Sequence, residues 1–473
     1  MPSLPILDQE VFDRYAGLSL PRHVSYPMPN WWRPLDADAA LSIWADVASP
    51  ARTRGLSLYL HIPFCESMCK FCGCNRTIVR KTSKGAKERT RRYLDALLKD
   101  VCSRGRMFDR SRIVRQIHWG GGTPTYLEPD EIRELHGATR EAFTIDPGAE
   151  ISIEIDPRVT SRLQLETLRE LGFNRISLGV QDFEPEVQKH VHRIQPYEMV
   201  DELIRHCREL RFESVNFDLI YGLPYQTIET VENTVRQTIT LSPDRVAFYH
   251  YAQIPEKIAN QRGIHHHAMP GSQTKLTMFL SAVDLFEAAG YEFVGLDHFA
   301  KSDEMLTRAV QNHTVHRTFQ GMATGAALDL IGMGASSIST LHEIGFLHNI
   351  RNPDEYADAI ESGTEVSQRG MLLGHDDVIR QKLINDLYSH GAIVPDDLEA
   401  KFDIDFREYF ADEIDTLRTL EADGLIEIDD QLNLHLTFPL GRVLMRNVAA
   451  VFDAYLSGDA FRTGESHLYS VNA

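Results

Sequence analysis

The chain has 473 residues, of which 43% are hydrophobic and 25% are charged, an ordinary globular composition that excludes disordered and fibrous classes. Its formal charge of −19 argues against a surface that coats nucleic acid, because such surfaces need excess Lys and Arg to neutralise phosphates. Residues 1–16 have no signal-peptide pattern and no later stretch is long and apolar enough to span a membrane, so we expect a cytoplasmic protein.

Short β-rich runs alternate with longer amphipathic runs between residues 56 and 289. The predicted strands are 56–62, 115–119, 150–155, 175–180, 214–220 and 245–251. The predicted helices between and after them are 89–106, 128–143, 161–171, 199–210, 228–240 and 273–289. Six successive strand–helix units predict an α/β fold, a partial (β/α)6 barrel of the TIM type with parallel strands and right-handed crossovers.

The carboxyl ends of the strands are where such a barrel places its chemistry. The residues at or after the six predicted ends are polar or glycine-rich: the cysteine loop, 120–125, Glu154 and Asp156, Gln181 and Asp182, Asp218 and Tyr221, and Tyr251 and Ala252. Alternation along 150–156 puts Ser152, Glu154 and Asp156 on one face. Acidic groups inside a barrel need a ligand or a buried ion-pair partner, and the sequence leaves both readings open.

The pattern changes to helices after residue 368. Helices are expected at 376–390, 396–402, 406–423 and 441–456, with a small hairpin at 425–428 and 432–437. We therefore expect three parts: an N-terminal segment, 1–47, that covers the active site; a catalytic barrel, 48–368; and a smaller, mostly helical, winged-helix-like C-terminal domain, 369–473.

Four of the six cysteines lie within ten residues, spaced C-x3-C-x2-C-x-C from Cys65 to Cys74. Thiolates select zinc or iron–sulfur clusters. A structural zinc site usually pairs two short hooks across a longer loop, whereas these cysteines share one loop, so a cluster is favoured and zinc remains the alternative. Three ligands would leave one iron of a [4Fe–4S] cluster open to the amine and carboxylate of a small molecule. Cys102 and Cys207 are expected to be buried free thiols in helices.

The cysteine spacing, with Phe71 before the third cysteine, resembles the signature of the radical S-adenosylmethionine (SAM) superfamily. The run 120–125 lacks the Lys-Ser or Lys-Thr ending of a phosphate loop, and it resembles the superfamily's second motif. The resemblance implies one [4Fe–4S] cluster on Cys65, Cys69 and Cys72, with SAM on the open iron and cleaved reductively to a 5′-deoxyadenosyl radical. Cys74 is then expected near the active site but not as a ligand.

A narrower resemblance covers nearly the whole chain. Its motifs are 25–27 (SYP), 59–65 (YLHIPFC), 71–75 (FCGCN), 118–125, 179–183 (GVQDF), 218–224 (DLIYGLP), 297–300, 319–321, 332–334 and 446–447. Together they are similar to the family of oxygen-independent coproporphyrinogen III oxidases, also called coproporphyrinogen dehydrogenases. The resemblance implies anaerobic oxidative decarboxylation of two propionates of coproporphyrinogen III to vinyl groups, giving protoporphyrinogen IX in haem biosynthesis.

The same resemblance assigns residues, although it assigns no catalytic side chain beyond the cluster and cofactor. Positions matching contacts to the cluster-bound SAM are Tyr59, Gly121, Glu154, Ala252 and Ile338. Positions matching a second SAM are Phe71, Gly122, Thr123, Gln181, Arg193 and Asp218. The candidates for the tetracarboxylate substrate are Arg22, Tyr26, Cys74, Arg193, Arg317 and Gln320. Gln253 stands where many members have histidine, which puts substrate handling in doubt.

The expected partners are a small-molecule porphyrinogen and an electron donor such as a flavodoxin or ferredoxin system, and we expect a monomer. The rival functions are a related radical SAM methyltransferase, cyclopropanase or tetrapyrrole-opening enzyme, a haem chaperone, and a zinc-stabilised structural protein. Cys74, Tyr26 and the complete C-terminal part favour the oxidase. The histidines at 265–267 are expected to form a solvated loop rather than a metal site.

Overall fold

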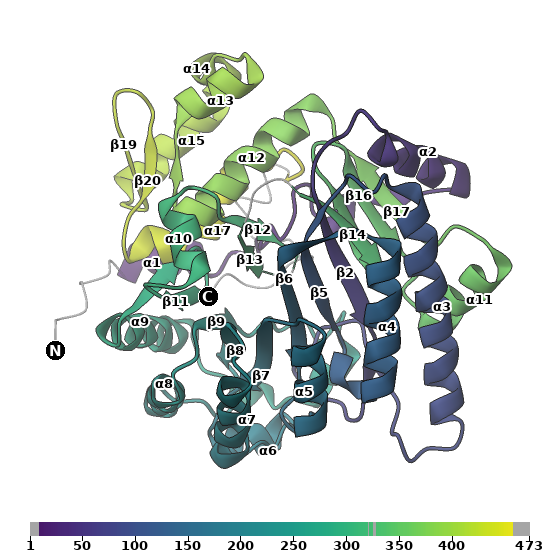
Figure 1. Ribbon diagram of the computed structural model, residues 1–473. Coiled ribbons are helices and arrows are strands. Elements are labelled where there is room, and N and C mark those ends of the chain that lie inside the picture. Colours follow the sequence, from purple (N-terminus) through teal and green to yellow (C-terminus); the bar gives the residue numbers. More distant parts are fainter. Residues whose placement is uncertain (1–8, 320, 325–327, 457–473) are drawn as a thin grey trace.

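A curved sheet of 13 strands organises the computed structural model, which describes residues 9–319, 321–324 and 328–456. The strand order is β1-β17-β16-β15-β14-β2-β5-β6-β7-β8-β9-β11-β10. Figure 1 shows the sheet curving around the molecule's interior, with one layer of helices on its outer face. The sheet has two edges and therefore forms an incomplete barrel.

The central strands pair in parallel and are each followed by a helix. The strands are β2 (Leu56–Ile62), β5 (Val114–Gly121), β6 (Ile145–Ile155), β7 (Arg175–Gln181), β8 (Ser214–Tyr221) and β9 (Arg245–His250). The outer helices are α3 (Ala86–Met107), α4 (Pro129–Ala142), α5 (Arg162–Glu170), α7 (Tyr197–Glu209), α8 (Ile228–Leu241) and α9 (Ser272–Ala288), with a short α6 (Pro185–His190). The predicted partial (β/α)6 barrel is confirmed.

Side-chain alternation along β2 explains how the barrel separates a dry outer layer from a polar interior. Leu56, Leu58 and Leu60 are fully buried against the helices. Burying one such side chain contributes roughly 1.5–3 kcal/mol. Tyr59 and His61, which alternate with them, hydrogen-bond to each other through Tyr59 Oη and His61 Nδ1 at 3.1 Å. The same residue pattern that stabilises the sheet therefore leaves its inner face available for polar contacts.

Antiparallel strands extend both ends of the parallel region, and the sequence did not reveal them. Beyond β9 lie β11 (His298–Lys301) and β10 (Tyr291–Val294). Beyond β2 lies β14 (Asp329–Met333), parallel to β2, followed by antiparallel β15 (Ile338–Leu341), β16 (Gly345–Asn349), β17 (Ser367–Leu372) and β1 (Arg33–Pro34). These strands have two to six residues, too few for a clear alternation to stand out from the surrounding turns.

The remaining elements surround this sheet. They are α1 (Gln9–Ala16), η1 (Pro29–Trp31), α2 (Ala37–Ala48), β3 (Phe64–Cys65), β4 (Thr77–Ile78), η2 (Pro124–Tyr126), η3 (Ala259–Gly263), η4 (His266–Ala268), α10 (Met305–Gln311), β12 (His316–Thr318), β13 (Gly321–Ala323) and α11 (Pro353–Ser362). The C-terminal elements are α12 (His375–His390), β18 (Ala392–Ile393), α13 (Pro395–Phe402), α14 (Phe406–Tyr409), α15 (Ala411–Ala422), β19 (Ile426–Ile428), β20 (Leu434–Leu436), α16 (Leu440–Val443) and α17 (Met445–Val451). Within the described ranges, no helix is long and apolar enough to cross a membrane.

Two predicted C-terminal helices are interrupted. The helix expected over 406–423 breaks at Phe410, whose ring is fully buried and packs edge-on against Phe452. The helix expected over 441–456 is replaced by α16 and α17, which meet at the buried Leu444. Both breaks come from tertiary packing of an apolar side chain, which overrides the helical pattern of the sequence.

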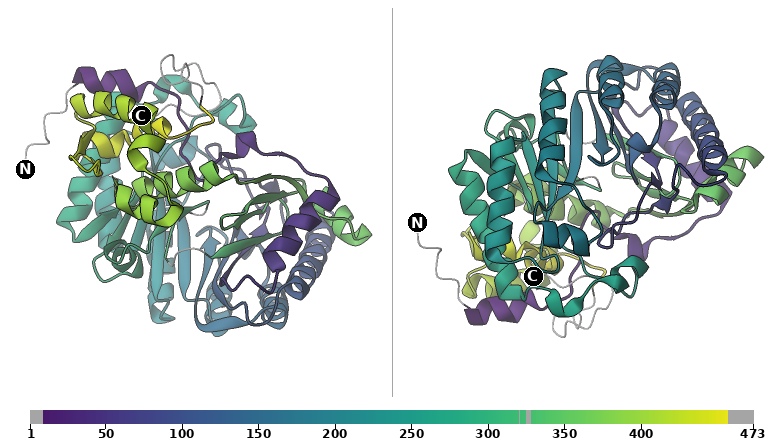
Figure 2. Two further views of the ribbon diagram at one scale, coloured as in Figure 1. Left: turned by 90° about the horizontal axis from the view of Figure 1, so that it is seen from above. Right: turned by 90° about the horizontal axis from the view of Figure 1, so that it is seen from below.

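The N-terminal segment is attached to the C-terminal helices. Tyr15 donates to Asp423 at 2.5 Å, and buried His23 contacts Asp453 at 3.0 Å. Tyr26 Oη accepts from the backbone N–H of Ala454 at 3.1 Å. Both views of Figure 2 show the purple α1 beside the yellow-green C-terminal elements. Because β1 and β17 also share the main sheet, the division into 1–47, 48–368 and 369–473 stays a prediction.

Candidate active site

The loop that carries four cysteines begins where β2 ends. Its first cysteine, Cys65, lies in β3, which pairs with β4 so that Cys65 is opposite Ile78. The side-chain amide of Asn260 contacts the carbonyl oxygens of Cys69, Lys70 and Cys72 at 3.1, 2.8 and 3.0 Å. A distant part of the chain thus holds the loop in one shape.

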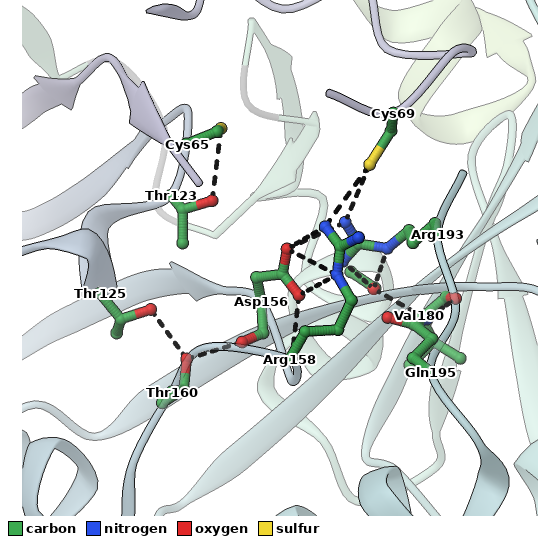
Figure 3. Close-up of polar contacts among 11 residues, drawn as sticks. Cys65, Cys69, Thr123, Thr125, Asp156, Arg158, Thr160, Val180, Arg193 and Gln195 are labelled. Atoms are coloured by element: carbon green, nitrogen blue, oxygen red, sulfur yellow. Dashed lines mark hydrogen bonds and ion pairs between the residues drawn. The ribbon is translucent and has the colours of Figure 1, made fainter. Parts of the chain in front are cut away.

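Cys69 faces two guanidinium groups. Its Sγ lies 3.5 Å from Arg158 Nη2 and 3.5 Å from Arg193 Nη1. Both arginines also bind Asp156, at 2.6 and 3.1 Å (Figure 3). Burial favours the neutral acid, but the charges of Arg193 and Arg158 outweigh it and lower the pKa of Asp156 to about 2. Two cations shared with one carboxylate leave net positive charge beside this thiol.

The other thiols of the loop differ in their surroundings. Cys65 Sγ lies 3.4 Å from Thr123 Oγ1, and burial raises the pKa of the Cys65 thiol to about 11. A hydrogen bond from Cys74 lowers the pKa of the Cys72 thiol to about 6. Across the described part of the chain, no group of three or more His, Cys, Asp or Glu side chains could hold a single metal ion.

A cavity of about 800 Å³ lies between the cysteine loop and the inner face of the sheet. This volume is typical of a site for a cofactor or a drug-sized ligand. Fourteen predicted site residues line it: Tyr26, Cys65, Cys69, Phe71, Cys72, Cys74, Gly121, Gly122, Thr123, Glu154, Gln181, Arg193, Asp218 and Arg317. They come from β5, β6, β7 and β8 or the residues directly after them, the cysteine loop, the loop after α6, β12 and the N-terminal segment. The barrel therefore brings together most of the set that the sequence indicated.

The glycines after β5 allow the cysteine loop to lie directly on the strand end. Gly121 has a φ of +116°, and a Cβ there would lie 2.7 Å from the His61 ring. A Cβ on Gly122 would lie 2.7 Å from the backbone of Pro63. Any larger side chain would push the loop away or fill the cavity edge. The glycines are thus needed for the cysteine loop to pack closely against the end of the strand. A ligand bound directly by this backbone would need glycines there for the same reason.

Polar contacts organise the inner wall next to these glycines. The His118 ring stacks on Tyr59 with centroids 5.9 Å apart, and its nitrogens contact Ser152 at 2.7 Å and Glu154 at 3.2 Å. The other oxygen of Glu154 accepts from the Gly121 N–H at 3.2 Å. Burial opposes ionisation of Glu154, but His118 and the Gly121 N–H together lower its pKa. Ser152 and Glu154 share the inner face, as alternation predicts.

Asp218 lies deeper in the cavity. It accepts hydrogen bonds from Ser177 at 3.1 Å and Asn216 at 2.9 Å. Burial, and next the charge of Glu154, raise the pKa of Asp218 to about 6. The group therefore changes charge near neutral pH, in a position where it faces the cavity.

Some predicted residues lie outside the cavity lining. Tyr59 does not line the cavity itself but stacks on His118, which does. The carbonyl oxygen of Ala252 accepts a hydrogen bond from the Gln261 side chain at 2.9 Å. Ile338 begins β15, where its backbone packs against Gly332. Arg22 lines a separate small cavity and pairs with Asp297. Gln320 lies outside the described residues.

Other residues contribute to the site without having been foreseen. Arg158 follows β6 in a loop, and Asn260 and Gln261 belong to η3. Gln261 donates to the carbonyl oxygen of Phe71 at 3.0 Å, which adds a second anchor for the cysteine loop. Nothing in the local sequence distinguishes an arginine or amide of this kind from a surface residue. His118 belonged to the motif 118–125 but had been given no role.

Comparisons with known proteins agree with this geometry. A family model described as the radical SAM superfamily matches residues 59–238. The oxygen-independent coproporphyrinogen III oxidase of Salmonella typhimurium is 40% identical over 442 residues, covering 93% of this chain and 93% of that protein. Its namesake from Escherichia coli is 39% identical over 444 residues, with the same coverage. The solved structure of the Escherichia coli coproporphyrinogen III oxidase, described as a radical SAM enzyme, matches with a TM-score of 0.86 and 38% identity, covering 95% of this chain and 99% of that one.

Proposed function

The chain belongs to the family of oxygen-independent coproporphyrinogen III oxidases, and we propose that its cavity carries out the reaction after which that family is named. The reaction is the oxidative decarboxylation of two propionate side chains of coproporphyrinogen III to vinyl groups, which gives protoporphyrinogen IX in haem biosynthesis. The observation that supports it most directly is the meeting of three thiols, a glycine-rich strand end and buried cations in one cavity.

The donor set fits a [4Fe–4S] cluster and SAM. Cys65, Cys69 and Cys72 would hold the cluster, because they line one cavity and their sulfurs are the soft ligands that iron–sulfur clusters take. The carboxylate of Glu154 would accept hydrogen bonds from the cofactor's amine. The backbone at Gly121 would bind the cofactor's carboxylate. When bound, these groups supply one-electron reduction and hydrogen-atom abstraction.

The protein's own side chains would position the substrate. Asp297 is shared by Arg22, His298 and Arg317, so the donors around it carry more positive charge than one carboxylate neutralises. Buried Arg317 Nε has no hydrogen-bond partner among the described residues, and Arg317 lines the cavity. We propose that Arg317 binds a propionate of the substrate, since a guanidinium donates two parallel hydrogen bonds to a carboxylate. Arg22 would act indirectly, through Asp297.

Asp218 gives a pH dependence that can be measured. The ionised carboxylate should bind the cationic SAM more tightly than the protonated form does. The affinity of the protein for SAM should therefore rise by up to about tenfold between pH 5 and pH 7, as this carboxyl, with its pKa of about 6, loses its proton. Asp218→Asn should flatten this rise and weaken binding at pH 7. Isothermal titration calorimetry with SAM on the anaerobically reconstituted protein measures both effects.

Asp182 provides the matched control. Burial also raises its pKa to about 6, but its carboxylate bonds Gln226 and Thr234 and lies outside the cavity lining. Asp182→Asn should therefore keep the pH dependence of binding. A flat profile in the unmodified protein would remove the role given to Asp218.

The function is tested by an anaerobic assay with reconstituted protein, reductant, SAM and coproporphyrinogen III. The expected products are 5′-deoxyadenosine and protoporphyrinogen IX. Deoxyadenosine without a vinyl product would reject this substrate and favour a related radical SAM enzyme, and neither product would favour a binding protein such as a haem chaperone. We further propose that the protein acts as a cytoplasmic monomer reduced by a flavodoxin or ferredoxin system.

A further inference from the structure

Positive charge is concentrated around the cysteine loop. Residues 66–92 contain nine Lys and Arg but only two Glu, whereas the whole chain has a formal charge of −19. The segment runs from the loop through β4 to the first turns of α3. A cationic region of this kind in an acidic protein needs an explanation beyond average composition.

The segment's fold keeps its cations next to the first cysteine. The Val79 N–H donates to the Cys65 carbonyl at 2.9 Å, and the Lys81 N–H donates to Glu66 Oε1 at 3.3 Å. A turn closed by the Ser83 N–H and the Arg80 carbonyl then leads into α3. The amino end of this helix directly follows that turn, and the helix dipole adds to the positive potential there.

Arg76 donates to the Cys74 carbonyl oxygen at 3.1 Å, and ion pairing divides the other eight cations of the segment into two groups. Lys81, Arg89, Arg91 and Arg92 pair with acids of neighbouring helices, so they serve the fold. Lys70, Arg80, Lys84 and Lys87 form no ion pair within the described ranges, and the last three are exposed. Their charge is therefore available to an external partner.

Two exposed apolar side chains belong to the same segment. Met68, between the first two cysteines, is 44% exposed, and Ile78, opposite Cys65 in the β3–β4 pair, is 38% exposed. A small apolar centre with a charged rim is the usual composition of a protein interface.

We propose that Met68, Lys70, Ile78, Arg80, Lys84 and Lys87 form a docking surface, the loop face, for an acidic protein that carries one electron at a time. This inference rests on the proposed function, because the cluster held by this loop must be reduced before each cleavage. The step passes one electron from the reduced carrier to the cluster, so the carrier is oxidised and no bond forms between the two proteins. Charge complementarity steers the acidic carrier to this strongly basic segment of a chain that is acidic as a whole.

The test is the double variant Lys84→Glu with Lys87→Glu, using reduced flavodoxin as the probe. Its affinity, measured by calorimetry at low salt on the reconstituted protein, should fall on the order of tenfold, and the salt dependence of binding should weaken. Deoxyadenosine formation driven by flavodoxin should show a raised KM for flavodoxin. Formation driven by dithionite, a small reductant that needs no docking, should be unchanged.

The matched control is Lys99→Glu with Arg106→Glu. These exposed residues lie on the same helix, with Lys99 about 20 Å along the axis from its first residue, and the charge change is identical. Equal losses in the two double variants, or no loss in the first, would overturn the docking proposal. Failure of dithionite to drive cleavage in the unmodified protein would instead reject the proposed function, and the docking proposal with it.

Discussion

Cys69→Ser should abolish both the iron–sulfur cluster and turnover. Cys69 is buried in the cavity wall, and its Sγ lies 3.5 Å from each of two guanidinium groups. A serine hydroxyl stays protonated and is a hard ligand, so it cannot replace a soft thiolate on iron. Iron and sulfide analysis after anaerobic reconstitution, together with visible absorption, should show loss of the cluster, and 5′-deoxyadenosine should fall below detection.

Cys74→Ser and Cys207→Ser are the controls. Cys74 lines the cavity but is predicted not to be a ligand, so its variant should keep the cluster while losing activity if the thiol contacts substrate. Cys207 is fully buried in α7 and should tolerate the change with an intact cluster. Loss of the cluster from Cys74→Ser would contradict the assignment of three ligands.

Asp156→Asn should destabilise the protein without its cluster by about 3 kcal/mol, the lower end of the cost of breaking a buried ion pair. The lower end applies because the side chain of Arg158 is 17% exposed, so water partly screens its charge. An asparagine keeps the size of the side chain but leaves Arg158 and Arg193 as two neighbouring charges with no carboxylate. The midpoint of urea denaturation measures the loss, and reduced cluster occupancy should accompany it.

The pH dependence of the stability difference between Asp156→Asn and the unmodified protein separates an effect of charge from an effect of packing. The pKa of Asp156 is about 2 in the folded chain and 3.8 ordinarily, so its contribution to stability is complete above about pH 4 and is lost as the pH falls towards 2. The gap in stability between variant and parent should therefore begin to shrink below about pH 4 and continue to shrink towards pH 2. A gap that stays constant down to pH 2 would show that Asp156 acts by shape rather than by charge.

The elements that the sequence predicts correctly are those whose residue pattern lies within a single strand or loop. The six parallel strands alternate or form apolar runs of clear period, so their expected positions agree with the structure to within a few residues. The cysteine spacing and the glycine run likewise need no tertiary information, and both line the cavity.

The rest depended on contacts between distant parts of the chain. The short antiparallel strands at the two ends of the sheet have no periodic pattern of their own. Arg158 and Asn260 gain their importance only from where β6 and η3 place them beside the loop. Arg22 and Arg317 looked alike in the sequence, yet only Arg317 lines the cavity, because Arg22 approaches Asp297 from the other side.

The attachment of residues 15–26 to residues 423–454 sets an order of assembly. A chain leaves the ribosome with its amino end first, and its barrel can fold as a unit while synthesis continues. The partners of Tyr15, His23 and Tyr26 are Asp423, Asp453 and Ala454, which are made 408 to 430 residues later. Residues 23–26 line the cavity and cannot be fixed there until those partners exist, so we expect the newly made cysteine loop to remain accessible to iron and sulfide until then.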